Sequence, residues 1–140
     1  MTPAVVATCG GERFAMAFEP AAPLASAAVR DLLPLVGKVR HAKWSGEAFW
    51  LPLERPLEGV ELENATSYPA PGDVLLYRGD GAGVPELLFA YGAVHFRGKA
   101  GSMNGIHVLT AIGGIEALRA IGALTDWGGA QPITLELEST

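Results

Sequence analysis

Glycine and proline make up a fifth of this chain, and they limit the folds that it can adopt. The 140 residues include 18 glycines and 10 prolines. That content is high for a helical bundle but normal for short strands joined by tight turns. Hydrophobic residues make up 49% and charged residues only 18%, which excludes a disordered chain. We therefore expect one compact domain spanning residues 1–140.

The apolar pattern predicts about eight short strands and two helices. Alternation with a period of two marks the strands, and apolar stripes at helical spacing mark the helices at 22–33 and 114–124. The expected strands are 5–8, 12–18, 39–44, 47–51, 74–77, 86–91 with a continuation at 94–96, 105–112 and 133–138, with short extended pieces near 60–62 and 65–68. Between them, 97–103 is expected to be a flexible basic loop and Trp127-Gly128-Gly129 a turn. The order does not alternate as βαβ units do. We therefore predict a mainly β fold, a small closed or nearly closed barrel capped by two helices.

Charge and cysteine content narrow the partners that we expect. The formal charge is −5, and the longest basic stretch, 38–43, alternates like the solvated face of a strand, so we expect no nucleic-acid partner. The single Cys9 excludes an internal disulfide, and the three histidines lack paired spacing, so we predict no metal and no cofactor. No apolar run is long enough for a membrane span, and the N-terminus lacks signal-peptide features, so the expected location is cytoplasmic.

Four stretches resemble an uncharacterised bacterial and archaeal family with a cyclophilin-like barrel fold. These stretches are Tyr68-Pro-Ala-Pro-Gly-Asp73 with its continuation to Tyr77, 86–92 with Phe96, 101–110 around Gly105-Ile-His107, and 19–23 with Leu33-Pro34 and Trp44-Ser-Gly46. Together they cover most of the chain, in the family's order. The sequence departs from the family at Ile106, where an asparagine is expected, and Asn104 lies two positions earlier.

The resemblance implies a fold more than an activity. Cyclophilins are peptidyl-prolyl isomerases, but their Phe-His-Arg and Gln-Gly-Gly motifs do not occur here; His95-Phe96-Arg97 has the residue types in another order. The family is also similar to the core domain of cucumopine synthase, which joins histidine to a 2-oxo acid by ring closure. That similarity implies that small-molecule chemistry is compatible with this barrel.

Two residues are predicted to transfer protons. His107 follows a glycine-containing loop and would be a neutral base near pH 7, unless it is a core histidine bonded to backbone. Tyr91 lies beside Gly92, where a phenol can orient a carbonyl or act as a weak acid, unless it only packs.

Four further residues are predicted to contact a ligand: Tyr77, Asn104, Phe89 and Tyr68. Asn104 would anchor a carboxylate or amide, with a turn residue as the alternative. Tyr68 precedes Pro69, where stacking in the turn is the expected role. Trp44 and Trp50 can stack a planar ligand, although packing in the core or a cap is the expectation.

Two functions from different classes follow. The first is a site for a small carboxylate, amide or nitrogen heterocycle, with proton-transfer or ring-forming chemistry as a further expectation. The second is a structural or oligomeric interaction module, in which the chain functions as a homo-oligomer or an enzyme subunit. A peptidyl-prolyl isomerase is a weaker third.

Overall fold

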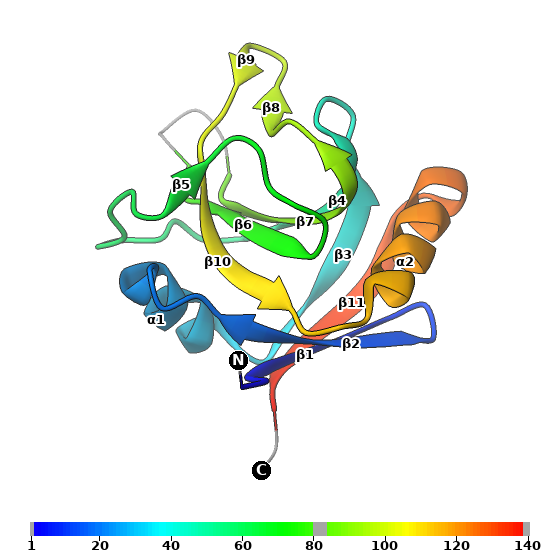
Figure 1. Ribbon diagram of the computed structural model, residues 1–140, viewed down its shortest axis with the longest axis horizontal. Coiled ribbons are helices and arrows are strands. Elements are labelled where there is room, and N and C mark those ends of the chain that lie inside the picture. Colours follow the sequence, from blue (N-terminus) through cyan, green and yellow to red (C-terminus); the bar gives the residue numbers. More distant parts are fainter. Residues whose placement is uncertain (1, 80–83, 139–140) are drawn as a thin grey trace.

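A computed structural model describes residues 2–79 and 84–138. They form a mainly β structure with two helices (Figure 1). The elements are, in chain order, β1 (Val5–Cys9), β2 (Glu12–Phe18), α1 (Pro23–Leu32), β3 (Leu35–His41), β4 (Gly46–Pro52), β5 (Ala65–Thr66), β6 (Asp73–Tyr77), β7 (Glu86–Val94), β8 (Arg97–Gly98), β9 (Gly101–Ser102), β10 (Gly105–Ala111), α2 (Ile115–Gly128) and β11 (Gln131–Leu137).

Eight antiparallel strands close into a barrel. The sheet order is β2-β1-β11-β3-β4-β7-β6-β10, and β10 pairs back onto β2. That closing pairing is short, because it joins only Leu109, Thr110 and Ala111 to Phe18, Ala17 and Met16. β5 is an additional strand on the edge of β10, and β8 with β9 forms a separate two-stranded hairpin. The predicted closed barrel is therefore confirmed.

Apolar side chains fill the inside of the barrel. Alternate residues of each strand point inward, and the inward set is completely buried, including Leu51, Leu76 and Ile106. At the centre the Phe49 and Phe89 rings are stacked with centroids 5.0 Å apart. The interior is thus a packed core rather than a binding cavity.

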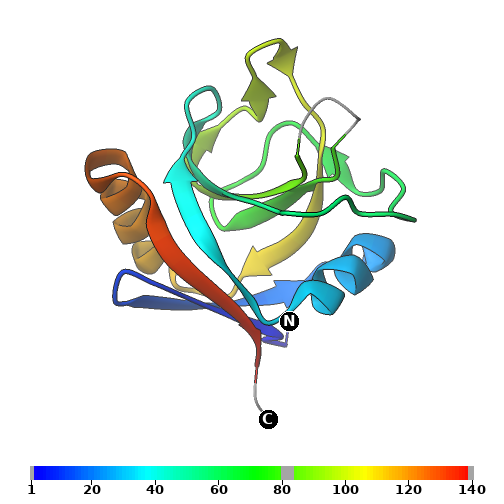
Figure 2. The ribbon, with the colours of Figure 1, turned by 180° about the vertical axis from the view of Figure 1, so that it is seen from behind.

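The two helices pack their apolar sides against this core and lie on opposite sides of the barrel (Figures 1 and 2). Pro23 opens α1, where its missing N–H and fixed φ suit the first turn. Ala25 and Val29 of α1 and Leu118 and Ile121 of α2 are the buried residues on these faces. Among the described residues, neither helix is long and apolar enough to cross a membrane.

Several local expectations differ from the structure. The strand expected at 39–44 runs instead from Leu35 to His41, because residues 35–39 pair with β11. Residues 60–62 are not a strand, because Val60 is drawn into the core and its carbonyl accepts a hydrogen bond from Arg78 Nη1. α2 continues to Gly128, so Trp127 is helical rather than part of a turn. The basic segment 97–103 is not an irregular loop, because β8 and β9 pair within it.

The expected bend at Gly92 is a β-bulge within a continuous strand. β7 runs through Gly92 to Val94, and residues 91–93 face the single residue Glu47 of β4. The Glu47 carboxylate accepts a hydrogen bond from the Ala93 N–H at 2.8 Å. A Cβ at Gly92 would lie 2.3 Å from that carboxylate, so the bulge requires glycine there.

Gly122 of α2 supplies a prediction for the packing of the helix on the barrel. A Cβ at this position would lie 2.4 Å from the ring of Tyr91. We expect Gly122→Ala to lower the free energy of unfolding by about 1–3 kcal/mol through overpacking, although alanine favours helices. Urea denaturation measures the change.

The same substitution in a Tyr91→Ala background is the control. With the ring removed, Gly122→Ala should be neutral or stabilise the protein by up to about 1 kcal/mol. An equal loss of stability in both backgrounds would show that the Tyr91 contact is not the cause.

Candidate functional site

The polar chemistry of this protein lies on the outer wall of the barrel. Cross-strand partners place Arg40, Trp50, Leu88, Leu75 and His107 in one row across β3, β4, β7, β6 and β10. Because strand residues alternate between faces, these five side chains share the outer side of the sheet. The middle of the row is apolar and buried, and the polar side chains of Arg40 and His107 lie at its two ends.

The middle of the row belongs to a second, smaller apolar cluster on the outer wall. Ala48, Leu75, Leu88 and Phe96 are its buried members. Phe96 is 1% exposed, and a Cβ at Gly105 would lie 3.2 Å from its ring, so Phe96 lies close against β10. This cluster separates a cavity near β3 and β4 from a polar cluster near β10.

The cavity has a volume of about 780 Å³ and lies between the outer wall and the β8–β9 hairpin. The chain connecting β3 to β4 supplies a further wall. Its polar and aromatic lining residues are Arg40, His41, Lys43, Trp44, Ser45, Trp50, Tyr77, Glu86, Phe96, Arg97, Lys99 and Ser102. The volume lies within the range of about 300–1,000 Å³ that is usual for small-molecule sites.

Aromatic side chains form one side of this cavity. Trp50 lies under the guanidinium of Arg40, whose carbon is 5.2 Å from the ring centroid. Tyr77 packs edge-on against Phe96, with ring centroids 5.9 Å apart. Trp44 was expected to pack in the core or a cap, but it is 54% exposed and lines the same cavity. A flat ring entering here would find π faces to stack on.

Glu86 is the acidic group of the cavity wall. It opens β7, where it is paired with Tyr77 of β6 on one side and Pro52 of β4 on the other. Burial raises the pKa of Glu86 to about 7, because the charged carboxylate loses its hydration there. A carboxyl group with a pKa near 7 can both donate and accept a proton at neutral pH.

The remaining charges around the cavity are positive. Its described lining residues include four basic side chains, Arg40, Lys43, Arg97 and Lys99, and Glu86 is the one acidic residue among them. The whole chain has a formal charge of −5. The cavity is therefore a local cationic region on an acidic protein, which favours an anionic ligand.

Tyr91 lies behind the cavity wall and is connected to it through His41. The Tyr91 hydroxyl lies 2.7 Å from His41 Nε2, and His41 Nδ1 lies 2.9 Å from the Ala42 carbonyl oxygen. Because a carbonyl only accepts, the Ala42 carbonyl places the hydrogen of a neutral His41 ring on Nδ1, which leaves Nε2 to accept from the Tyr91 hydroxyl. Burial, with smaller effects of Glu47 and Asp126, raises the pKa of Tyr91. Ala42 thus sets the tautomer of the cavity residue His41, and Tyr91 is bonded to its other ring nitrogen.

His107 belongs to a polar cluster of its own at the other end of the row. Thr110 Oγ1 donates to Glu19 Oε2 at 2.9 Å, so it accepts a hydrogen bond from His107 Nε2 at 2.8 Å. Asp73 Oδ1 lies 3.3 Å from the same nitrogen, and Glu19 Oε1 lies 3.9 Å from Nδ1. These side chains come from β6, β10 and the residue after β2, so they tie together the seam where the barrel closes.

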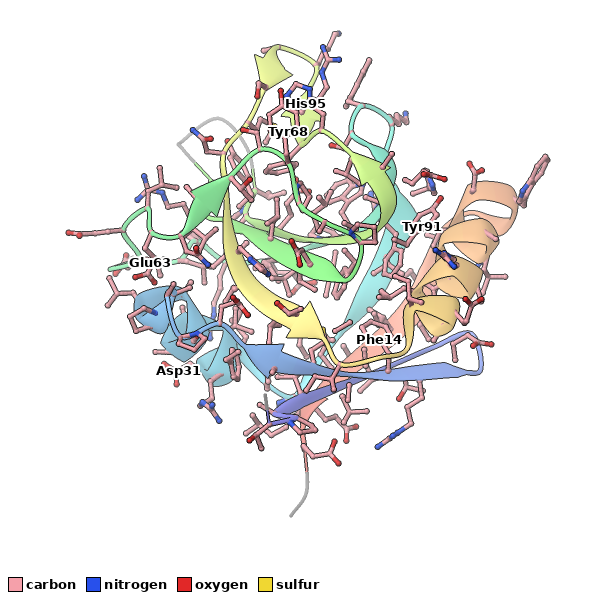
Figure 3. All side chains as sticks on the ribbon, viewed as in Figure 1. Phe14, Asp31, Glu63, Tyr68, Tyr91 and His95 are labelled. Carbon is pink, nitrogen blue, oxygen red and sulfur yellow. The ribbon has the colours of Figure 1, made fainter. Side chains whose placement is uncertain are left out.

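The candidate residues predicted from the sequence do not converge on one site. Tyr77 lines the cavity, and Tyr91 reaches it only through His41. Tyr68 is 69% exposed and stacks on His95 with centroids 4.5 Å apart; Figure 3 shows the two together, far from Tyr91 beside α2. Asn104 is exposed and accepts a hydrogen bond from Ser67.

Phe89, which the sequence predicts as a ligand contact, lies inside the packed barrel, and that role stays a prediction. Its side chain is 0% exposed and packs inside the barrel between Phe49 and Phe14. The physical reason is strand parity, because Phe89 points inward while its neighbour Leu88 points outward. Among residues 2–79 and 84–138, no group of three or more His, Cys, Asp and Glu has the arrangement of a metal site.

Sequence reasoning missed Glu86, Arg40 and Arg97 as site residues. The sequence did contain a signal for the two arginines, which is their position in basic segments. Arg40 belongs to the solvated face predicted for 38–43, and Arg97 begins the basic segment 97–103. The two segments border one cavity because β3 pairs with β4 and because the β8–β9 hairpin folds over the outer wall of the barrel.

The closed eight-stranded barrel with its two helices has a cyclophilin-like fold. A solved structure described as "Structure of McbB in complex with tryptophan" superposes with a TM-score of 0.77 at 17% sequence identity, covering 97% of this chain and 45% of that chain. The chain thus spans less than half of McbB. No curated protein shows significant similarity to it. Residues 6–137 match the family model "Protein of unknown function (DUF3830)", and the chain belongs to that family.

The raised pKa of Glu86 predicts how stability depends on pH. Between about pH 4.5 and 7 the native state retains a proton that the unfolded state has lost, so the free energy of unfolding falls as the pH rises through this window. Glu86→Gln removes this penalty. We expect the free energy of unfolding of the variant to rise relative to that of the parent between pH 5 and pH 8. Urea denaturation of both proteins measures the change.

Glu136→Gln, on the exposed side of β11, is the control for loss of one carboxylate. Its difference from the parent should not follow the Glu86 profile. Parallel pH profiles for the two variants would contradict the assignment of the titration to Glu86.

Thr110 supplies a prediction for the barrel seam. Thr110→Val keeps the shape but removes the hydroxyl that bonds both His107 and Glu19. We expect a loss of about 1–3 kcal/mol in the free energy of unfolding, because polar partners are left unsatisfied. Thr134→Val in β11, far from the seam cluster, should change stability less; an equal loss would show that the cluster contributes nothing specific.

Proposed function

We propose that this protein binds a small organic anion carrying a flat ring, and that the ligand occupies the outer-wall cavity. The observation that carries the proposal is the combination of Trp50, Arg40 and Glu86 around one hollow of about 780 Å³. An aromatic wall, a cation and a titratable acid are the groups that recognise a ring and a carboxylate. The packed barrel interior offers no comparable space.

The similarity to McbB supports this proposal. That structure holds tryptophan, which combines a planar heterocycle with a carboxylate. At 17% identity the similarity concerns the fold alone, so the chemical argument rests on this chain's own residues. The excess of basic over acidic side chains around the cavity supports an anionic ligand without reference to McbB.

Glu86 is the group that we propose for proton transfer on the bound ligand. As a carboxylate it accepts a proton from an acidic N–H or C–H of the ligand, and as a carboxyl group it returns the proton to another atom of the same ligand. The proton balance closes without an oxidant or a reductant. The sequence-based assignments of His107 and Tyr91 as proton-transfer groups stay predictions, with Tyr91 acting through His41 and His107 lying outside the cavity.

The proposal predicts a selective binding profile. L-tryptophan, indole-3-acetate and indole-3-acetamide are suitable probes, because the last two differ mainly in charge. We expect the acetate to bind at least about 10-fold more tightly than the amide at low ionic strength, with the difference shrinking as salt is added. Isothermal titration calorimetry and thermal shift measure both.

Trp50→Ala should weaken binding of indole-3-acetate by about 3- to 10-fold, in line with the energy of one aromatic contact. Trp127→Ala is the matched control, because Trp127 is an 89% exposed tryptophan on α2, outside the cavity. Absence of binding by every probe would overturn the proposal and leave the interaction module as the remaining prediction from the sequence.

A further inference from the structure

A second cavity adjoins the first on the same wall of the barrel. It has a volume of about 630 Å³, lies along the start of β3 and the end of β4, and is lined by Leu32, Leu35, Val36, Gly37, Lys38, Arg40, Pro52, Leu53, Glu54 and Arg55. Arg40 lines both cavities. The proposed function makes no use of this second space.

The register of the strands shows how the two cavities are arranged. Lys38 and Arg40 are alternate residues of β3, so both point outward, about 7 Å apart along the strand. Pro52 of the second cavity is the direct partner of Glu86 of the first cavity. The cavities are therefore neighbours on the outer wall both along β3 and across β4 and β7, with the stacked Arg40 and Trp50 side chains where they meet.

The second cavity is also cationic. Its described lining includes Lys38, Arg40 and Arg55, with Glu54 as the one acidic residue among them. Taken together, the described linings of the two cavities include six of the chain's ten Lys and Arg residues but only two of its fifteen Asp and Glu residues. This clustering of basic residues makes the positive region around the two cavities larger than the binding of one carboxylate requires.

We propose that the ligand is an elongated dianion whose ring and first carboxylate lie in the first cavity and whose second anionic group lies in the second. This inference rests on the proposed function and names its ligand class. Lys38 and Arg55 hold the second anionic group, which is a carboxylate or a phosphate. Arg40 lies between the two anionic groups of one molecule, because a single guanidinium that lines both cavities has enough N–H donors to bond each of them, while the other basic side chains supply the remaining positive charge.

Matched acyl derivatives of tryptophan test this class. N-succinyl-tryptophan carries a second carboxylate, whereas N-butanoyl-tryptophan has the same chain length without it. We expect the succinyl compound to bind at least about 10-fold more tightly at low ionic strength, measured by isothermal titration calorimetry. A 3-phosphonopropionyl derivative distinguishes phosphate from carboxylate, and a gain with either anionic derivative supports the proposal.

The cause of that gain is tested with Lys38→Gln and Arg55→Gln. Each substitution should reduce the advantage of the succinyl compound several-fold, and the double variant should abolish it, while affinity for the butanoyl compound stays unchanged. Arg13→Gln, an exposed cation of β2 that lines neither cavity, should leave both affinities as they are.

Three results would overturn the inference. Equal affinities for the succinyl and butanoyl compounds would reject the second anionic group while leaving the proposed function intact. An advantage that survives the double variant would place the second group elsewhere. No binding of either compound or of the simple indole probes would reject the proposed function and this inference together.

Discussion

Closure of the sheet by the pairing of β2 with β10 is the constraint on which the rest of this structure depends. Only three residue pairs make the closing ladder, and the cluster of Glu19, Asp73, His107 and Thr110 reinforces it from outside. Closure of eight strands leaves an interior that side chains fill completely. Phe49 and Phe89 are stacked inside that space, which is why the proposed site lies on the outer wall.

Strand alternation gives the outer wall a set of side chains separate from the core. Each of β3, β4, β6 and β7 contributes one face to the core and the opposite face to the cavities, so adjacent residues have opposite roles. Leu87 is buried in the barrel core, whereas Glu86 lines the cavity. The carboxyl group of Glu86 is rigidly placed because its backbone is bonded into the ladder between β4 and β6. Burial beside aromatic walls then accounts for its raised pKa.

Local sequence signals were sufficient for most of the fold and insufficient for the candidate site. Period-two alternation placed β2 at its observed bounds, Glu12–Phe18, and the glycine at 92 correctly indicated an irregular strand. The inward direction of Phe89 could not be read from the sequence, because its neighbours Leu88 and Ala90 are also apolar and give no sign of which face is the core. Glu86 was not predicted because its environment comes from Trp50, Tyr77 and a hairpin far away in sequence. The closed barrel could be predicted from short strands and turns, but the face on which a ligand would bind depends on long-range register.

The β8–β9 hairpin contributes walls to the first cavity without belonging to the barrel ladder. It is a separate two-stranded sheet, joined to the barrel through hydrogen bonds such as those between Ser45 Oγ and the backbone of Arg97. Its tip at Lys99 and Ala100 is exposed and contributes nothing to the core. One part of the wall of this cavity is therefore built from residues that the barrel does not need in order to fold, whereas the rest comes from the barrel strands themselves. The shape and charge of the cavity can thus be altered between residues 97 and 102 without touching the ladder that closes the barrel, which makes this short segment the natural starting point for a designed library.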